Sequence, residues 1–103
     1  MTKGKTILKN CAIEPEIKDL IFFLRKLGAK IKISGRTIVI KGSKIKKKLI
    51  SHKIIFDRIE AGTYMIASAL IGKRVIINKI NPGIIKNEIE ILKKMGVKIK
   101  KHT

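Results

Sequence analysis

The sequence is poor in several residue types, and each shortage excludes a class of protein. It has one cysteine, two prolines and no tryptophan, and aromatic residues make up 4% of its 103 positions. A single cysteine excludes an intrachain disulfide, which fits the reducing cytoplasm. No apolar run approaches the roughly 18 residues of a membrane span, and no export signal is visible. We therefore expect a cytoplasmic chain without a membrane segment.

Acidic residues are also scarce, because seven Asp and Glu stand against twenty-five Lys and Arg, which leaves a net charge of +18. Such a charge suits a polyanion partner, since lysines that neutralise phosphates release counterions. A solvated, lysine-rich surface explains it equally, because lysine is spread evenly along the chain. The few aromatic side chains fall on predicted core elements, so no base-stacking platform is evident. A small basic protein that binds nucleic acid non-specifically is therefore the second hypothesis.

The chain carries no motif for a metal, a cofactor or a nucleophile. His52 and His102 stand alone, without acids or cysteines at metal-ligand spacing. Cys11 has no histidine near it in sequence and is interpreted as a small buried residue. Walker and dinucleotide-binding glycine patterns are absent. We expect no metal site, no cofactor and no complete catalytic group.

Two parts of the chain repeat each other at an offset of 68 residues. GKTILKN (4–10) matches GKRVIIN (72–78), and LRKLGAKIK (24–32) matches LKKMGVKIK (92–100). Between these matches, both copies space their apolar residues as on one face of a helix. A proline stands near each predicted helix start, after Glu14 and after Asn81. Each copy therefore predicts a strand, a helix, a terminating glycine and a second strand.

The stretch between the copies predicts further elements. RTIVIKG (36–42) is rich in β-branched residues and should pair with residues 29–33 as a hairpin. Residues 54–59 are predicted as a strand that leads into a helix from Glu60 to Ile71. Apolar residues surround that helix, so we expect it to be buried on most sides.

Acidic residues gather at two predicted helix starts. Glu14 and Glu16 flank a proline in EPEI, and DRIE holds Asp57, Arg58 and Glu60. Carboxylates at these places interact favourably with the helix dipole. A cap by Glu60 and an Asp–Arg pair would explain DRIE structurally, and on this view replacing either acid should cost some stability. We expect Glu60→Ala to be mild and Asp57→Ala to be near neutral. The alternative is a ligand-facing surface, since backbone N–H groups in a first helical turn can face an anion.

EPEI, LGAKIKISGRTIVIKG and DRIEAGT, in this order, resemble the enolpyruvyl transferases, and among them the UDP-N-acetylglucosamine 1-carboxyvinyltransferase family. The resemblance extends from Lys3 to about Lys100 and implies a partial α/β fold. In that fold, repeated strand-helix-strand units build an inside-out α/β barrel. Residues 1–55 would end one domain, as strand-helix-hairpin. Residues 56–103 would begin the other, as strand-helix-strand-helix-strand.

The resemblance also implies a function. Members of the family move the enolpyruvyl group of phosphoenolpyruvate to UDP-N-acetylglucosamine in peptidoglycan precursor synthesis. Both substrates bind in a cleft, so the resemblance makes five residues candidates for lining it: Glu14, Glu16, Asp57, Arg58 and Glu60. The family's reactive cysteine, general-base aspartate and substrate-binding arginines have no counterparts in this stretch. Cys11 is not that cysteine, because it stands before EPEI, where the family commonly has alanine.

Two positions depart from the family pattern: Phe56 stands where proline is usual, and Ala61 where threonine is usual. The chain otherwise resembles the middle of the enzyme. We expect it to be incomplete on its own, as a subunit that needs the missing remainder of a split enzyme, a gene relic or an excerpt of a longer chain.

Overall fold

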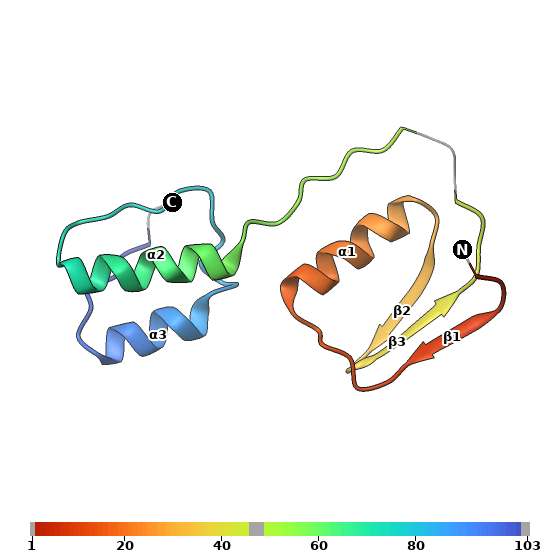
Figure 1. Cartoon of the computed structure of the whole chain (residues 1–103), viewed down its shortest axis with the longest axis horizontal. Coiled ribbons are helices and arrows are strands. Elements are labelled where there is room, and N and C mark those ends of the chain that lie inside the picture. Colours follow the sequence, from red (N-terminus) through yellow and green to blue (C-terminus); the bar gives the residue numbers. More distant parts are fainter. Residues whose placement is uncertain (1, 46–48, 102–103) are drawn as a thin grey trace. The chain divides into compact units, whose positions relative to one another are not determined.

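The computed structural model describes residues 2–45 and 49–101. Its elements (Figure 1) are β1 (Lys5–Leu8), α1 (Pro15–Lys26), β2 (Lys30–Ser34), β3 (Thr37–Lys41), α2 (Arg58–Ile71) and α3 (Lys86–Lys94). The predicted α/β class is confirmed. The chain divides into two compact units, one ending at Ile55 and the other beginning at Phe56, and each is described by itself. Within the described ranges, no helix is long and apolar enough to cross a membrane.

The first unit is built on a three-stranded antiparallel sheet with the order β1-β3-β2. β2 and β3 form the predicted hairpin, with Ser34 opposite Thr37. Gly35 in its turn has a φ of 56°, a conformation that glycine adopts without strain. β1 pairs with the other side of β3. Because both neighbours are antiparallel to β3, β1 and β2 run parallel to each other, and α1 connects them across the intervening strand.

α1 begins and ends where the sequence predicts. Pro15 occupies the first turn, where its missing N–H costs nothing. Gly28 ends the helix with a φ of 101°. The helix packs on one face of the sheet (Figure 1), and the buried side chains between them form one core cluster: Ile21, Ala29, Ile31 and Ile38. Cys11 packs against this cluster but is only half-buried, whereas the sequence predicted a buried residue.

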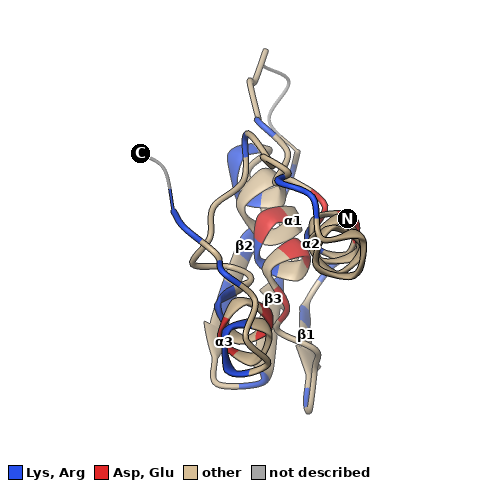
Figure 2. Ribbon diagram, turned by 90° about the vertical axis from the view of Figure 1, so that its left-hand side faces the viewer, with Lys and Arg blue, Asp and Glu red and all other residues tan. Residues whose placement is uncertain are grey.

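The face of the sheet that points away from α1 carries lysines. Lys5 and Lys30 both lie opposite Lys41, so three lysines form one row across the strands. All three side chains are exposed. Basic residues occur on strands and helices alike, whereas acidic residues lie on the helices or next to them (Figure 2). Like charges directly opposite each other disfavour strand pairing, so this row does not stabilise the sheet.

The second unit packs α2 against α3. Its buried cluster is Ala61, Met65, Ile85, Ile89 and Leu92, and Ile85 is fully buried. The partly buried side chains around this cluster come from the segments outside the helices: Phe56, Ile77, Ile80, Val97 and Ile99.

The repeat is visible in backbone hydrogen bonds. In the first unit, the Ala29 N–H donates to the Leu24 carbonyl at 3.0 Å. In the second unit, the Val97 N–H donates to the Leu92 carbonyl at 3.0 Å, which is the same bond 68 residues later. Gly96 repeats the positive φ of Gly28, at 93° against 101°. The two helix ends are therefore built alike, as the sequence predicts.

The strands predicted at 54–59, 72–78 and 97–100 do not form in the described residues. In the first unit, β1 and β2 pair only with β3 and not with each other. In the described part of the second unit, no strand pairs with the second copies of β1 and β2. Val97 to Lys100 still alternates half-buried and exposed residues, as a strand would.

Two expectations about the helices of the second unit are also corrected. α3 begins at Lys86 rather than at Pro82, because residues 82–85 form a turn. Asn81 caps that turn, since its Oδ1 accepts from the Gly83 N–H at 3.0 Å. Glycine next to the proline weakens helix formation there. α2 is not buried on most sides, since only one side contacts the core and the opposite side exposes Ile59, Ile66 and Leu70.

Hydrogen exchange should separate the two units. We expect the amides of Ile38 to Ile40 to exchange on the order of a hundredfold more slowly than those of Arg74 to Ile76, because only β3 is paired on both sides. Amide exchange followed by NMR on the folded chain measures this. Equally slow exchange in both stretches would contradict it, since residues 74–76 would then have a strand partner.

Candidate functional site

The start of α2 is organised by Asp57. Its Oδ1 accepts hydrogen bonds from the N–H groups of Ile59 at 2.9 Å and Glu60 at 3.1 Å. These are two of the donors that the first turn of a helix leaves without a partner inside the helix. The expectation that Glu60 is the cap is therefore wrong: Asp57 is the N-cap residue, and Glu60 lies in the first turn.

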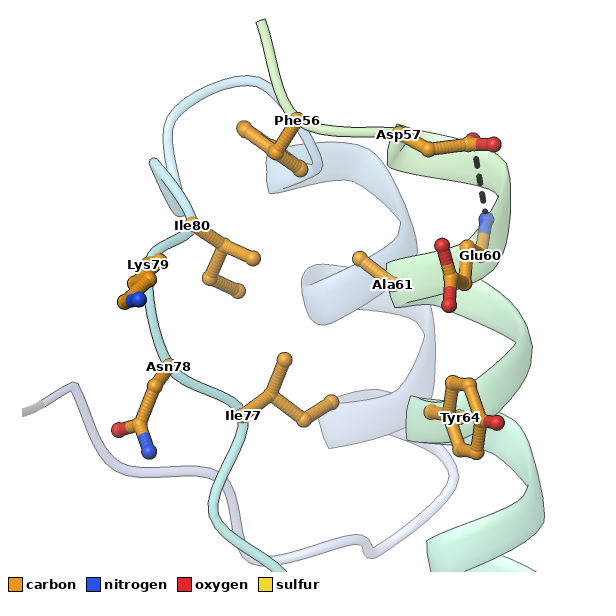
Figure 3. Close-up of a pocket in the computed structure, with 9 residues that line it drawn as sticks. All are labelled: Phe56, Asp57, Glu60, Ala61, Tyr64, Ile77, Asn78, Lys79 and Ile80. Atoms are coloured by element: carbon orange, nitrogen blue, oxygen red, sulfur yellow. Dashed lines mark hydrogen bonds between the residues drawn. The ribbon is translucent and has the colours of Figure 1, made fainter.

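A hollow of about 370 Å³ adjoins this helix start (Figure 3). Ile77 and Ile80 point from the facing segment toward α2, whereas Asn78 and Lys79 point away from it (Figure 3). The remaining lining residues are Phe56, Asp57, Glu60, Ala61 and Tyr64. The hollow is therefore apolar inside. Of its two carboxylates, that of Asp57 is engaged in capping.

The other predicted residues lie apart from this hollow. Arg58 is half-buried in the first turn of α2 and is not among the lining residues. Glu14 holds the N-cap position of α1, but its side chain makes no capping bond. Its carbonyl oxygen accepts from the Ile17 N–H at 3.0 Å instead. Glu14 and Glu16 are both exposed.

Glu16 lines a second hollow, of about 350 Å³, within the first unit. The other lining residues come from α1 and from the segment before Phe56: Asp19, Leu20, Phe23, His52, Ile54 and Ile55. The structure therefore places Asp57 with Glu60 at one hollow and Glu16 at another. That the five predicted residues line one substrate cleft stays a prediction.

Sequence reasoning missed the pair of Asp19 and His52. His52 Nε2 lies 3.1 Å from Asp19 Oδ1, and their side chains are 11% and 22% exposed. From the sequence, His52 stands alone, and Asp19 falls within the helix predicted to begin at Pro15. The residues are 33 positions apart, and no local pattern joins them.

The chemistry available from these side chains is hydrogen bonding rather than metal binding. Among the described residues, no group of three or more His, Cys, Asp or Glu could hold a metal ion. An ionised carboxylate only accepts hydrogen bonds. Exposed carboxylates at two helix starts can therefore accept hydrogen bonds from the hydroxyl or amide N–H groups of a polar ligand.

A comparison of the whole chain with protein families identifies its class. The model of the family described as EPSP synthase (3-phosphoshikimate 1-carboxyvinyltransferase) matches residues 1–103. The chain therefore belongs to this family of enolpyruvyl transferases.

Individual relatives carry a more particular name. The chain is 53% identical over 100 residues to a UDP-N-acetylglucosamine 1-carboxyvinyltransferase of Pelagibacter ubique, an alignment that covers 96% of this chain and 24% of that protein. A relative of that name from Endomicrobium trichonymphae is 46% identical, with 97% and 24% covered. UDP-N-acetylglucosamine 1-carboxyvinyltransferase 2 of Bacillus subtilis is 45% identical, with 96% and 23% covered. The chain thus spans about a quarter of the length of these curated relatives.

The capping geometry predicts an order of effects opposite to the one expected from sequence. Asp57→Ala should lower the free energy of unfolding of the second unit by about 0.5–2 kcal/mol, because two N–H groups lose their acceptor. Glu60→Ala should cost less, since its exposed carboxylate contributes only through the helix dipole.

Urea unfolding of both variants beside the parent checks this order. Asp57→Asn is the matched control, because asparagine caps about as well as aspartate. A larger loss for Glu60→Ala than for Asp57→Ala would show that the bonds of Asp57 do not hold the helix start.

Proposed function

We propose that this chain is part of an enolpyruvyl transferase that moves the enolpyruvyl group of phosphoenolpyruvate to UDP-N-acetylglucosamine. The observation that carries the proposal is the identity of 53% over 100 residues to a relative with that name. Transfer to this acceptor is a step of peptidoglycan precursor synthesis in the cytoplasm. None of the relatives reported above is named as a nucleic-acid-binding protein, and the second hypothesis has no support.

We infer that the two units belong to two domains of an inside-out α/β barrel, the first ending at residue 55 and the second beginning at residue 56. The outer side of α2 supports a larger assembly. No residue from Ala61 to Ile71 is charged. The hydroxyls of Thr63 and Ser68 donate back to the carbonyls of Ile59 and Tyr64, at 2.8 and 2.6 Å. Such a surface can be buried without leaving the hydroxyls of Thr63 and Ser68 unpaired, so the rest of the enzyme would cover it.

In the complete enzyme, Glu14, Glu16, Asp57, Arg58 and Glu60 would line the substrate cleft. An ionised carboxylate can only accept hydrogen bonds. The exposed carboxylates therefore suit the hydroxyl and amide N–H groups of the sugar, which donate them. Asp57 would act indirectly, since its carboxylate already holds the first turn of α2. The groups that react with phosphoenolpyruvate would lie in the remainder of the enzyme.

A chimera tests the proposal. The matching quarter of the Pelagibacter ubique relative is replaced by this sequence. Phosphate release is then measured with phosphoenolpyruvate and either UDP-N-acetylglucosamine or 3-phosphoshikimate as acceptor. We expect release with the first acceptor only. Release with 3-phosphoshikimate alone, or with neither acceptor from a folded chimera, would overturn the proposed function.

Substitutions in the chimera test the cleft residues. Glu16→Gln should reduce turnover about tenfold or more, if its charge accepts a substrate hydrogen bond. Lys18→Gln is the matched control, because it neutralises an exposed neighbour on α1 and should leave turnover within about twofold. Equal turnover of both variants would remove Glu16 from the cleft.

The isolated chain should release no phosphate above background from the same substrates. Its described residues bring no nucleophile, base and cationic clamp together, as this reaction would need. Turnover by the purified 103-residue chain would contradict this prediction.

A further inference from the structure

The segment that ends the first unit is fastened to α1 by polar contacts. Asp19 Oδ1 lies 3.1 Å from His52 Nε2, and Asp19 Oδ2 accepts from the Ile55 N–H at 3.5 Å. One carboxylate therefore contacts both a side chain and a backbone group of residues 52–55. About two turns further along α1, the Lys26 ammonium donates to the Ser51 carbonyl at 2.7 Å.

These contacts hold a segment that has no secondary structure of its own. Residues 51–55 belong to neither a helix nor a strand. His52 is 11% exposed, and its ring lies 5.4 Å from that of Phe23, one helical turn after Asp19. Asp19, Phe23 and Lys26 follow each other at helical spacing, so a single stripe of α1 receives the whole segment.

The contact with Asp19 indicates which ring nitrogen of His52 donates. An ionised carboxylate cannot donate, so the proton of the bond lies on His52 Nε2. Nδ1 is buried and has no hydrogen-bond partner among the described residues. A buried nitrogen without a partner lowers stability. The contact of His52 with Asp19 therefore stabilises the fold less than it would if Nδ1 were also hydrogen-bonded, but it still holds residues 51–55 on α1.

We propose that Asp19 and His52 are positioning residues that clasp residues 51–55 to α1 and thereby confine the joint between the two units to Phe56 and Asp57. The last fastened group is the Ile55 N–H, and α2 begins at Arg58. Two residues thus remain between the clasp and a rigid helix whose N-cap is Asp57. When the clasp opens, the joint lengthens to include residues 51–55. The length of the joint, and with it the range of arrangements of the units, depends on one carboxylate.

The distribution of distances between the units tests the proposal. Spin labels are placed by Lys32→Cys and Lys93→Cys, both exposed, in a chain that carries Cys11→Ser. We expect Asp19→Ala and His52→Ala each to broaden the distance distribution about twofold or more, and the double variant to broaden it no further. Glu90→Gln is the control, because it breaks an exposed ion pair with Lys86 within the second unit and should leave the width unchanged.

Two further readouts separate a clasp from general stabilisation. In the parent, the Ile55 amide should exchange about tenfold more slowly than that of Lys53, and Asp19→Ala should abolish the difference. Nitrogen NMR of the imidazole should show the proton on Nε2 in the parent and in Asp19→Asn, which keeps an acceptor oxygen. It should show a tautomer mixture in Asp19→Ala.

Two results would overturn the proposal. One is a lowered unfolding midpoint in Asp19→Ala with an unchanged distance distribution, which would make the pair purely structural. The other is a parent in which Ile55 and Lys53 exchange alike, whether from a loose segment or from an unfolded first unit.

Discussion

Every strand of this structure depends on β3. A peptide group buried without a hydrogen-bond partner costs free energy comparable to a lost bond, and β3 provides partners on both of its sides. With it, the parallel strands β1 and β2 form one sheet, and α1 has an apolar surface to cover. In the described residues, the second copy has its helix, its terminating glycine and its buried stripe, but no strand pairing. Comparison of the two copies thus shows which features follow from local sequence, namely the helix and its terminating glycine, and which need strand pairing, namely the sheet.

This separation explains how much of the fold the sequence predicted. The hairpin, the span of α1 and the glycine ends of both helices follow from residues within a few positions of each other, and they were predicted correctly. The strand predicted at 97–100 carries the right alternation, but a strand needs a partner that is distant in sequence. The start of α3 was misplaced because Gly83 and the capping of a turn by Asn81 outweigh the helix preference of Pro82.

The site divides in the same way. The sequence predicted correctly that acids gather at helix starts, because the helix dipole makes such places favourable for carboxylates. The sequence could not show which acid caps α2, since Asp57 and Glu60 both fit the pattern. The structure identifies Asp57, because its carboxylate accepts the two hydrogen bonds. The contact of Asp19 with His52 depends on the path of a segment without secondary structure, for which periodicity gives no signal. The family to which the chain belongs underlies the proposal that these acids line a substrate cleft.

The lysine row across the sheet has a consequence for self-association. β1 and β2 are both edge strands, and their sequences KTIL and KIKIS contain residues of high β-propensity. A second molecule that added a strand in register at either edge would bring its own row of lysines beside Lys5 or Lys30. Charged residues, lysine above all, are a common means by which edge strands avoid such additions. The repulsion between lysines that disfavours strand pairing within one sheet therefore also opposes the addition of strands from other molecules, and with it the growth of a fibril.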